Sequence, residues 1–146
     1  MKTLTWWLRI VGALYVVEGG GLALAGFFDP NAFAAIWAST DVGALDEVAV
    51  RGIRIAGLPG VLTWALLGVM MLIFSRMPER ARLLVTIVAA WELLVWLPVD
   101  LVGLSSGFAV PRALTLITIH AVIGVSGLLL LRLQSQEHAS GDVRGN

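Results

Sequence analysis

The chain has 146 residues, of which 58% are hydrophobic and 14% are charged, whereas about a quarter of the residues are charged in typical soluble domains. Ten basic and ten acidic residues give a net charge of zero, which provides no reason to expect nucleic acid as a partner. The absence of cysteine excludes disulfides, thiol catalysis and thiolate metal sites. The two histidines, His120 and His138, are too far apart to predict a metal site, so we expect no metal and no cofactor.

Four apolar stretches, each close to bilayer-spanning length, divide nearly the whole chain. They occupy residues 5–28, 48–74, 81–104 and 111–133. A hydrocarbon core about 30 Å thick needs roughly 20 helical residues, and the backbone polar groups inside it must be bonded within each helix. We therefore predict an all-α polytopic membrane protein, with a four-transmembrane-helix bundle over residues 1–133. The small and polar residues of 134–146 predict a disordered cytoplasmic tail.

The first stretch contains Arg9, Glu18 and a glycine triplet at residues 19–21. The triplet predicts either a close packing surface or a locally unwound turn. In outline the stretch also resembles a signal peptide, with Lys2 near its start and a small-x-small sequence at residues 23–25. The two charges inside the apolar run, and its full spanning length, favour a retained helix over a cleaved signal.

The first connection and the second stretch follow directly. Asp29 followed by Pro30 is typical of a helix start, and it predicts a short helix in the first connection. This helix would lie at the membrane interface or cover the end of the bundle. The second stretch begins with Arg51 and Arg54, which share a helical face, and Pro59 is expected to kink it.

The third and fourth stretches carry the remaining polar groups. In the third, Glu92, Trp96 and Asp100 recur every four residues, and Pro98 removes a helical hydrogen bond between the two acids. In the fourth, His120 shares a face with glycines four and seven residues later, which indicates that the histidine looks into the bundle.

Lysine and arginine are distributed asymmetrically among the connections. The second connection, residues 75–82, holds three arginines, and Lys2 precedes the first stretch. The first connection, residues 29–47, has four acidic residues and no lysine or arginine. Because cytoplasmic loops carry the excess of positive charge, both termini are predicted to be cytoplasmic (N-in, C-in). All four helices then place an ionisable group in the outer half of the bilayer.

Ionisable groups at membrane depth are costly and usually functional, so they define the candidate site. The predicted ligand-binding residues are Arg51, Arg54, Glu18, Glu92, Trp96, Asp100 and His120. Glu18, Glu92 and Asp100 are also the candidate catalytic residues. We expect Arg54 and Glu92 to belong to one network, because a long guanidinium reaches toward the middle of the bilayer. Trp64, Trp91 and Trp96 are deep enough to line a cavity.

Three functions fit this polar set, and the sequence leaves enzymatic activity open. The first is an accessory protein that binds or helps to move a small, largely apolar molecule through a polar pocket in the outer half of the bundle. The second is a membrane-embedded acid–base enzyme of the isomerase or epoxide-opening type. The third is a structural subunit whose ion-pair network only stabilises the helices. A cavity lined by carboxylates and tryptophans favours the first two, and tight packing favours the third.

Three segments carry a resemblance to a known family: LRIVGALYVVEGGGLAL at residues 8–24, RGIRIAGLPG at 51–60 and WELLVWLPVDL at 91–101. In these segments the chain resembles the small four-helix BphX-like membrane proteins, over most of residues 8–133. The resemblance implies a multi-pass protein of the bacterial inner membrane, in a family named from aromatic-degradation gene clusters and without an established activity. It implies, as partner, a small apolar or aromatic compound or an enzyme that handles one, and it transfers no catalytic residue.

Overall fold

The computed structural model describes residues 2–37, 45–105 and 110–143, and every regular element in these ranges is helical. The elements are α1 (Lys2–Phe28), α2 (Pro30–Trp37), α3 (Glu47–Phe74), the short 3-10 helix η2 (Pro78–Arg80), α4 (Arg82–Trp91), the π-helical turn η3 (Glu92–Trp96), α5 (Leu97–Ser105) and α6 (Val110–Val143). Four helices are long and apolar enough to cross a membrane: Lys2–Phe28, Glu47–Phe74, Arg82–Ser105 and Ala113–Gln136. This is the architecture of a multi-pass membrane protein with an all-helical bundle.

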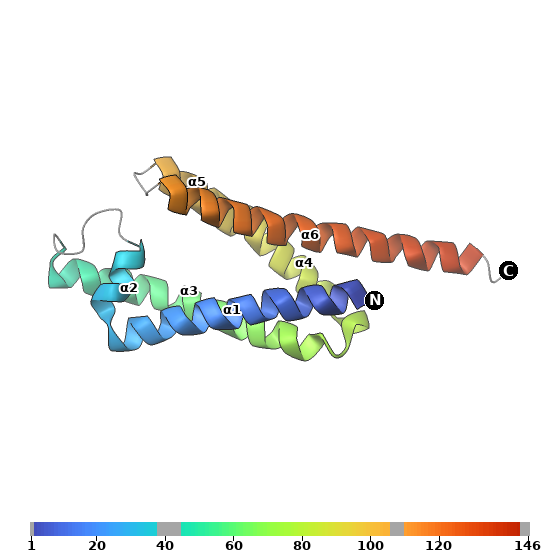
Figure 1. The fold of residues 1–146 in the computed structure, drawn as a ribbon, viewed down its shortest axis with the longest axis horizontal. Coiled ribbons are helices and arrows are strands. Elements are labelled where there is room, and N and C mark those ends of the chain that lie inside the picture. Colours follow the sequence, from blue (N-terminus) through green and yellow to red (C-terminus); the bar gives the residue numbers. More distant parts are fainter. Residues whose placement is uncertain (1, 38–44, 106–109, 144–146) are drawn as a thin grey trace.

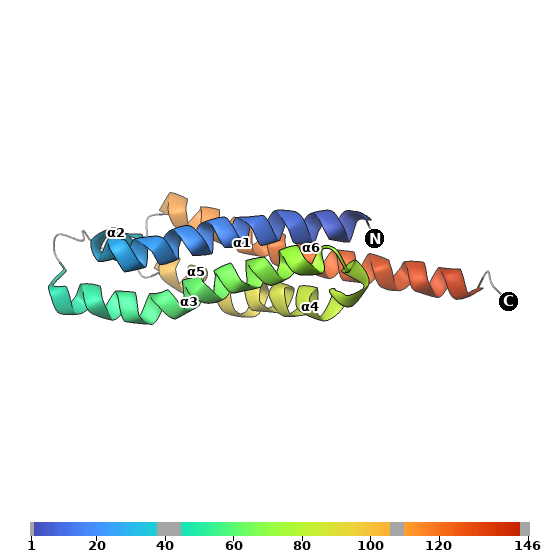
Figure 2. The same ribbon diagram turned by 90° about the horizontal axis from the view of Figure 1, so that it is seen from below.

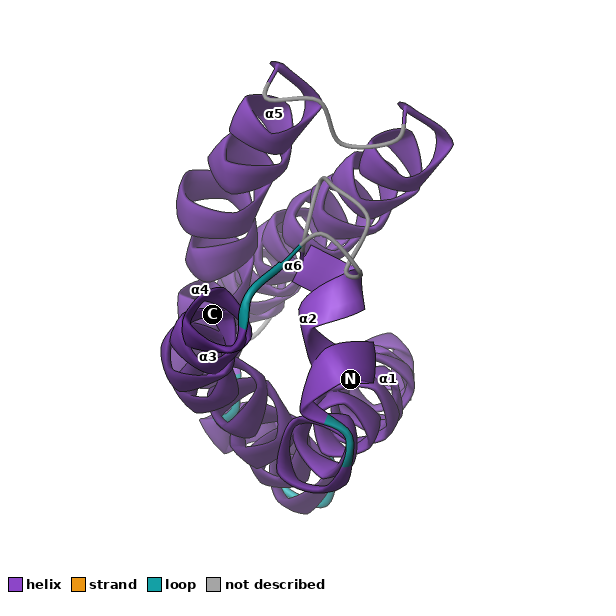
Figure 3. Ribbon diagram, turned by 90° about the vertical axis from the view of Figure 1, so that its left-hand side faces the viewer, coloured by secondary structure: helices purple, strands orange, loops and turns teal. Residues whose placement is uncertain are grey.

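The four long helices form two antiparallel pairs (Figures 1 and 2). α1 packs along α3, and α6 packs along the continuous segment formed by α4, η3 and α5. The two pairs diverge toward the end of the molecule that carries α2 (Figure 1). Viewed from that end, α2 lies between the pairs (Figure 3). The divergence leaves room between the pairs for a site, and α2 lies next to it.

Glycines allow α1 and α3 to approach each other closely. A Cβ atom added to Gly68 would lie 2.6 Å from the carbonyl oxygen of Gly12, and one added to Gly19 would lie 2.7 Å from the carbonyl oxygen of Val61. By contrast, a Cβ at Gly20 or Gly21 would meet no atom within 4 Å. α1 is helical throughout, so the glycine triplet is a packing surface at Gly19 and is not an unwound turn.

The short helix α2 packs against the first pair, α1 and α3. The Oδ1 atom of Asp29 accepts a hydrogen bond from the backbone N–H of Ala32 at 3.0 Å. Pro30 occupies the first helical position, where a backbone N–H would have no partner within the helix, so its missing N–H costs nothing. Phe33 is fully buried, and its ring lies against Gly26 and Gly57. α2 therefore packs on α1 and α3 and covers the end of the bundle.

The last helix is longer than the sequence suggests. Residues 134–143, predicted to be disordered, are helical as far as Val143, and the end of α6 projects beyond the bundle (Figure 1). The side chain of Arg82 donates a hydrogen bond of 2.9 Å to the hydroxyl of Ser135, so the first turn of this extension contacts α4. Polar residues such as glutamine and glutamate are good helix formers, and no glycine or proline interrupts α6 between Leu128 and Ser140.

Candidate functional site

A π-helical turn in the third transmembrane segment brings two acidic residues onto one face. Glu92 and Asp100 are eight residues apart, which in a regular α-helix separates their directions by about 80°. In η3, Leu97 donates its N–H to the carbonyl of Glu92, five residues earlier, and the extra residue reduces that separation to about 20°. Pro98, which has no N–H, follows directly. Such turns are frequent at functional sites.

Both acids pair with His120 of α6. The Nδ1 atom of His120 shares a short hydrogen bond with the Oε2 atom of Glu92. Its Nε2 atom lies 3.5 Å from the Oδ2 atom of Asp100, an ion-pair contact that is longer than a hydrogen bond. Glu92 is 0% exposed, and the other two side chains are also buried. Since an isolated buried charge is costly, the three groups form one interdependent unit, the Glu92–His120–Asp100 triad.

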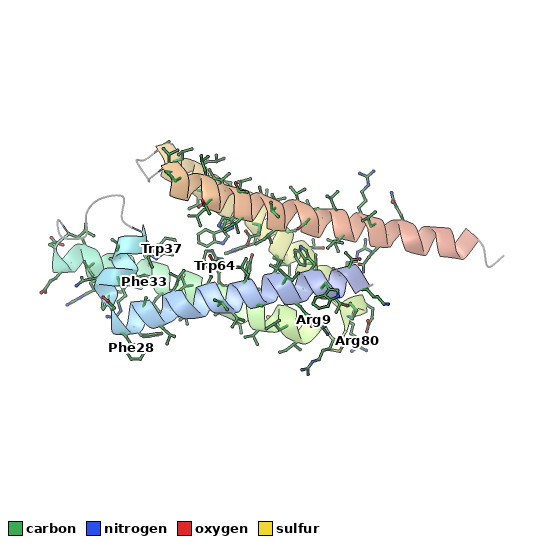
Figure 4. The ribbon with its side chains drawn as sticks, viewed as in Figure 1. Arg9, Phe28, Phe33, Trp37, Trp64 and Arg80 are labelled. Carbon is green, nitrogen blue, oxygen red and sulfur yellow. The ribbon has the colours of Figure 1, made fainter. Side chains whose placement is uncertain are left out.

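Aromatic rings connect this triad to the first helix pair. Trp96 stacks on the imidazole of His120 with ring centroids 5.9 Å apart, and Trp64 of α3 lies 4.7 Å from Trp96. Tyr15 of α1 packs against Trp64 at 6.2 Å. Figure 4 shows Trp64 in the space between the two pairs. Aromatic side chains therefore form the contact between the two helix pairs beside the triad.

A partly enclosed cavity of about 230 Å³ lies beside the triad, between the two helix pairs. All four long helical segments and α2 contribute to its wall. The lining residues are Glu18, Leu22, Ile36, Trp37, Trp64, Trp96, Asp100, Leu116, Ile119 and His120. The wall is mainly apolar and aromatic, with two carboxylates and an imidazole, which is the composition expected of a small-molecule site.

Four polar atoms in the cavity wall are buried without a hydrogen-bond partner among the described residues. They are the indole Nε1 atoms of Trp37, Trp64 and Trp96 and the Oδ2 atom of Asp100. By contrast, the indole of Trp7, nearer the other end of the bundle, donates to the hydroxyl of Ser126 at 2.8 Å. An unpaired buried polar group costs about 1–3 kcal/mol. These unpaired N–H donors belong to side chains that line the cavity.

Most of the predicted site residues come together here. Glu92, Trp96, Asp100 and His120 are in contact, and Glu18 lines the same cavity, half-buried and close enough to interact electrostatically with His120. No three His, Asp or Glu side chains in the described ranges are grouped so that they could hold a metal ion.

The two arginines lie elsewhere, and the predicted network between Arg54 and Glu92 is wrong. No ion pair joins them in the described part of the chain; Arg51 and Arg54 line a separate surface pocket with Glu47. The residue of α3 that faces His120 is Trp64, with ring centroids 6.1 Å apart. Trp64 lies ten residues after Arg54, a rise of about 15 Å along the helix, which a guanidinium cannot span.

Sequence reasoning underestimated the aromatic and aliphatic part of the site. Trp64 and Trp96 line the cavity as expected, whereas Trp91 is 38% exposed on the outer surface of α4. The predicted site residues did not include Trp37, Leu116 or Ile119, which also line the cavity. Leu116 lies four residues before His120 and three before Ile119, which places it on the helix face of the histidine, and that spacing was the available signal.

No protein-family model, curated protein or solved structure matches this chain.

Proposed function

We propose that this protein binds a small, largely apolar molecule, aromatic compounds included, in the cavity between its two helix pairs, and helps to move that molecule within the membrane. The observation that carries the proposal is the cavity itself, in which the Glu92–His120–Asp100 triad meets the aromatic wall formed by Trp64 and Trp96. A purely structural network needs no cavity beside it.

The chemistry of the wall indicates what kind of molecule fits. A volume of about 230 Å³ exceeds the engineered cavity of about 150 Å³ that binds benzene, so one or two fused rings can be accommodated. Indole rings stack on planar apolar bodies. The unpaired indole N–H groups favour a molecule that carries at least one hydrogen-bond acceptor, such as a carbonyl oxygen.

A pocket-filling substitution tests this proposal. Leu116 lines the cavity, whereas Leu114, on the same helix, is 51% exposed and does not. In nanodiscs, with empty nanodiscs as the blank, we expect wild type and Leu114→Trp to bind 1,4-naphthoquinone in equilibrium dialysis. Leu116→Trp should bind at least about tenfold more weakly, a loss of about 1.4 kcal/mol, because the added ring occupies the cavity. Equal binding by all three proteins, or none by wild type, would contradict the proposal.

A membrane-embedded acid–base enzyme is the second candidate, and the triad is the observation that favours it. His120 is held through Nδ1 by Glu92 while its Nε2 faces Asp100 at the cavity wall, so a proton can pass between the imidazole and Asp100, and between Asp100 and a bound molecule. In this function Asp100 and Glu18 are the further candidate catalytic residues. An isomerase or an epoxide-opening enzyme would lose turnover in His120→Gln while retaining binding.

The identity of the membrane and the orientation of the chain in it are also proposals. The resemblance to BphX-like proteins supports the bacterial inner membrane, with an enzyme of aromatic metabolism or another membrane protein as a possible partner. The N-terminus and the arginine-rich turn near Arg80 lie at the same end of the bundle, opposite α2, which supports the N-in, C-in topology (Figures 1 and 4). The short helix α2 then lies on the outer side, at the membrane interface.

The topology predicts the outcome of cysteine labelling, since the chain contains no native cysteine. Cysteines introduced at Asn31 and Met77 should react with an impermeant thiol reagent from opposite sides of the membrane, Asn31 from the outside. Labelling of both positions from the same side would refute the four-span arrangement. Loss of residues before Gly26 from the mature chain would instead support a cleaved signal peptide.

A further inference from the structure

A second cavity of about 350 Å³ adjoins the first one and shares two of its wall residues, Trp37 and Trp96. Its other wall is a stretch of α3 that contains Ala56, Gly57 and Gly60. The two indole side chains therefore stand between the cavities. Rotation of either side chain to another rotamer would connect them.

The second cavity opens toward a surface suited to lipid chains. From Ile55 to Phe74, α3 contains no charged residue, and neither does the segment from Leu93 to Val99 on the other side of the crevice. The crevice itself is lined by apolar residues and glycine, and Ala56 within it is exposed. A Cβ at Gly60 would meet no atom within 4 Å, so the crevice is open at that point. In a bilayer this surface faces hydrocarbon.

The short helix α2 lies on the axial route to the first cavity. α2 lies between the helix pairs at the divergent end (Figure 3), and its residues Ile36 and Trp37 form part of the cavity wall. A molecule arriving along the bundle axis meets α2, which Phe33 anchors by full burial. A molecule arriving sideways through the second cavity passes the indoles of Trp37 and Trp96, which line both cavities.

We propose that the second cavity is a lateral portal, through which a lipophilic molecule already dissolved in the bilayer passes between α3 and the η3–α5 segment into the first cavity. This inference rests on the proposed binding function and narrows its ligand to membrane-partitioned compounds with a hydrogen-bond acceptor. Trp37 and Trp96 gate the passage, and the small residues of α3 leave the width that it needs.

The test is kinetic and uses a matched pair of substitutions on α3. Gly60 and Gly52 both have open space at the Cβ position, but only Gly60 lines the portal. 1,4-Naphthoquinone delivered from loaded vesicles to protein in nanodiscs is followed by quenching of tryptophan fluorescence in stopped flow. We expect Gly60→Phe to slow association and dissociation alike, by about fivefold or more, with Kd changed by less than about twofold. Gly52→Phe should behave as wild type.

The outcomes of this experiment distinguish failure of the portal from failure of the binding function. Unchanged rates in Gly60→Phe, with normal affinity, would overturn the portal and leave the proposed binding intact. A weakened Kd with unchanged association would also overturn it, because the second cavity would then be part of the binding site. Failure of wild type to bind the quinone would overturn both proposals. Ala56→Phe, at an exposed position of the same crevice, repeats the test if Gly60→Phe does not fold.

Discussion

Replacing Glu92 with leucine is expected to lower the stability of the folded protein by about 3–5 kcal/mol, because the buried His120 loses its hydrogen-bonded carboxylate and keeps only the longer contact to Asp100. His120→Leu should cost a similar amount, since it removes the partner of a glutamate that is 0% exposed. The double substitution Glu92→Leu with His120→Leu should recover part of the loss, because the buried glutamate is no longer left without its partner, while the buried Asp100 still loses its contact with His120.

Thermal unfolding in detergent measures the stability of these three variants, with Arg54→Met as the control. Arg54 is only half-buried and lies outside the triad, so its substitution should cost less than about 1 kcal/mol. Additive losses in the double variant would mean that Glu92 and His120 do not depend on each other. If stability returns in the double variant while quinone binding is lost, the triad has a role beyond holding the helices together.

Gly68→Leu is expected to have the second largest effect, because it separates α1 from α3. Even a Cβ atom at Gly68 would lie 2.6 Å from the carbonyl oxygen of Gly12 and 2.8 Å from the Cβ of Tyr15. Both atoms belong to α1, so neither can move aside unless the packed helix moves with it. We expect a loss of about 3 kcal/mol, at the upper end of the cost of overpacking a core.

Gly20→Leu is the matched control, since a Cβ there meets no atom within 4 Å. It should change stability by no more than about 1 kcal/mol, and the better helix propensity of leucine can make it stabilising. Reversible unfolding of both variants in mixed micelles provides the comparison. Equal tolerance of leucine at the two glycines would show that α1 and α3 do not pack in this register.

The spans and the polar residues of the site were predictable because bilayer thickness and the cost of buried charge act on single segments. Residues 5–28 and 48–74 coincide closely with α1 and α3, whose observed bounds are Lys2–Phe28 and Glu47–Phe74. The inward orientation expected of His120 agrees with its burial. Each of these predictions used the sequence of a single helix and did not depend on the position of its neighbours.

The partners were harder to predict, because pairing depends on helix rotation and relative depth. The regular 3.6-residue period places Glu92 and Asp100 about 80° apart, and the π turn that aligns them was signalled only by Pro98. Arg54 appeared to be the natural counterion of Glu92, but the depth of α3 puts Trp64 opposite His120 instead. Charge complementarity alone did not distinguish a histidine partner from an arginine partner.

The most direct test of the binding site is the indole N–H spectrum of the six tryptophans, measured by NMR on ¹⁵N-tryptophan-labelled protein in nanodiscs and assigned by single Trp→Phe variants. On addition of 1,4-naphthoquinone, the resonances of Trp64 and Trp96, and that of Trp37, should shift and saturate together, because these side chains line the cavity. Those of Trp6 and Trp91, which are 61% and 38% exposed, should stay in place once the shift seen with a lipid-soluble alkane is subtracted. Shifts confined to Trp6 and Trp91, or equal shifts of all six, would contradict a binding site between the helix pairs.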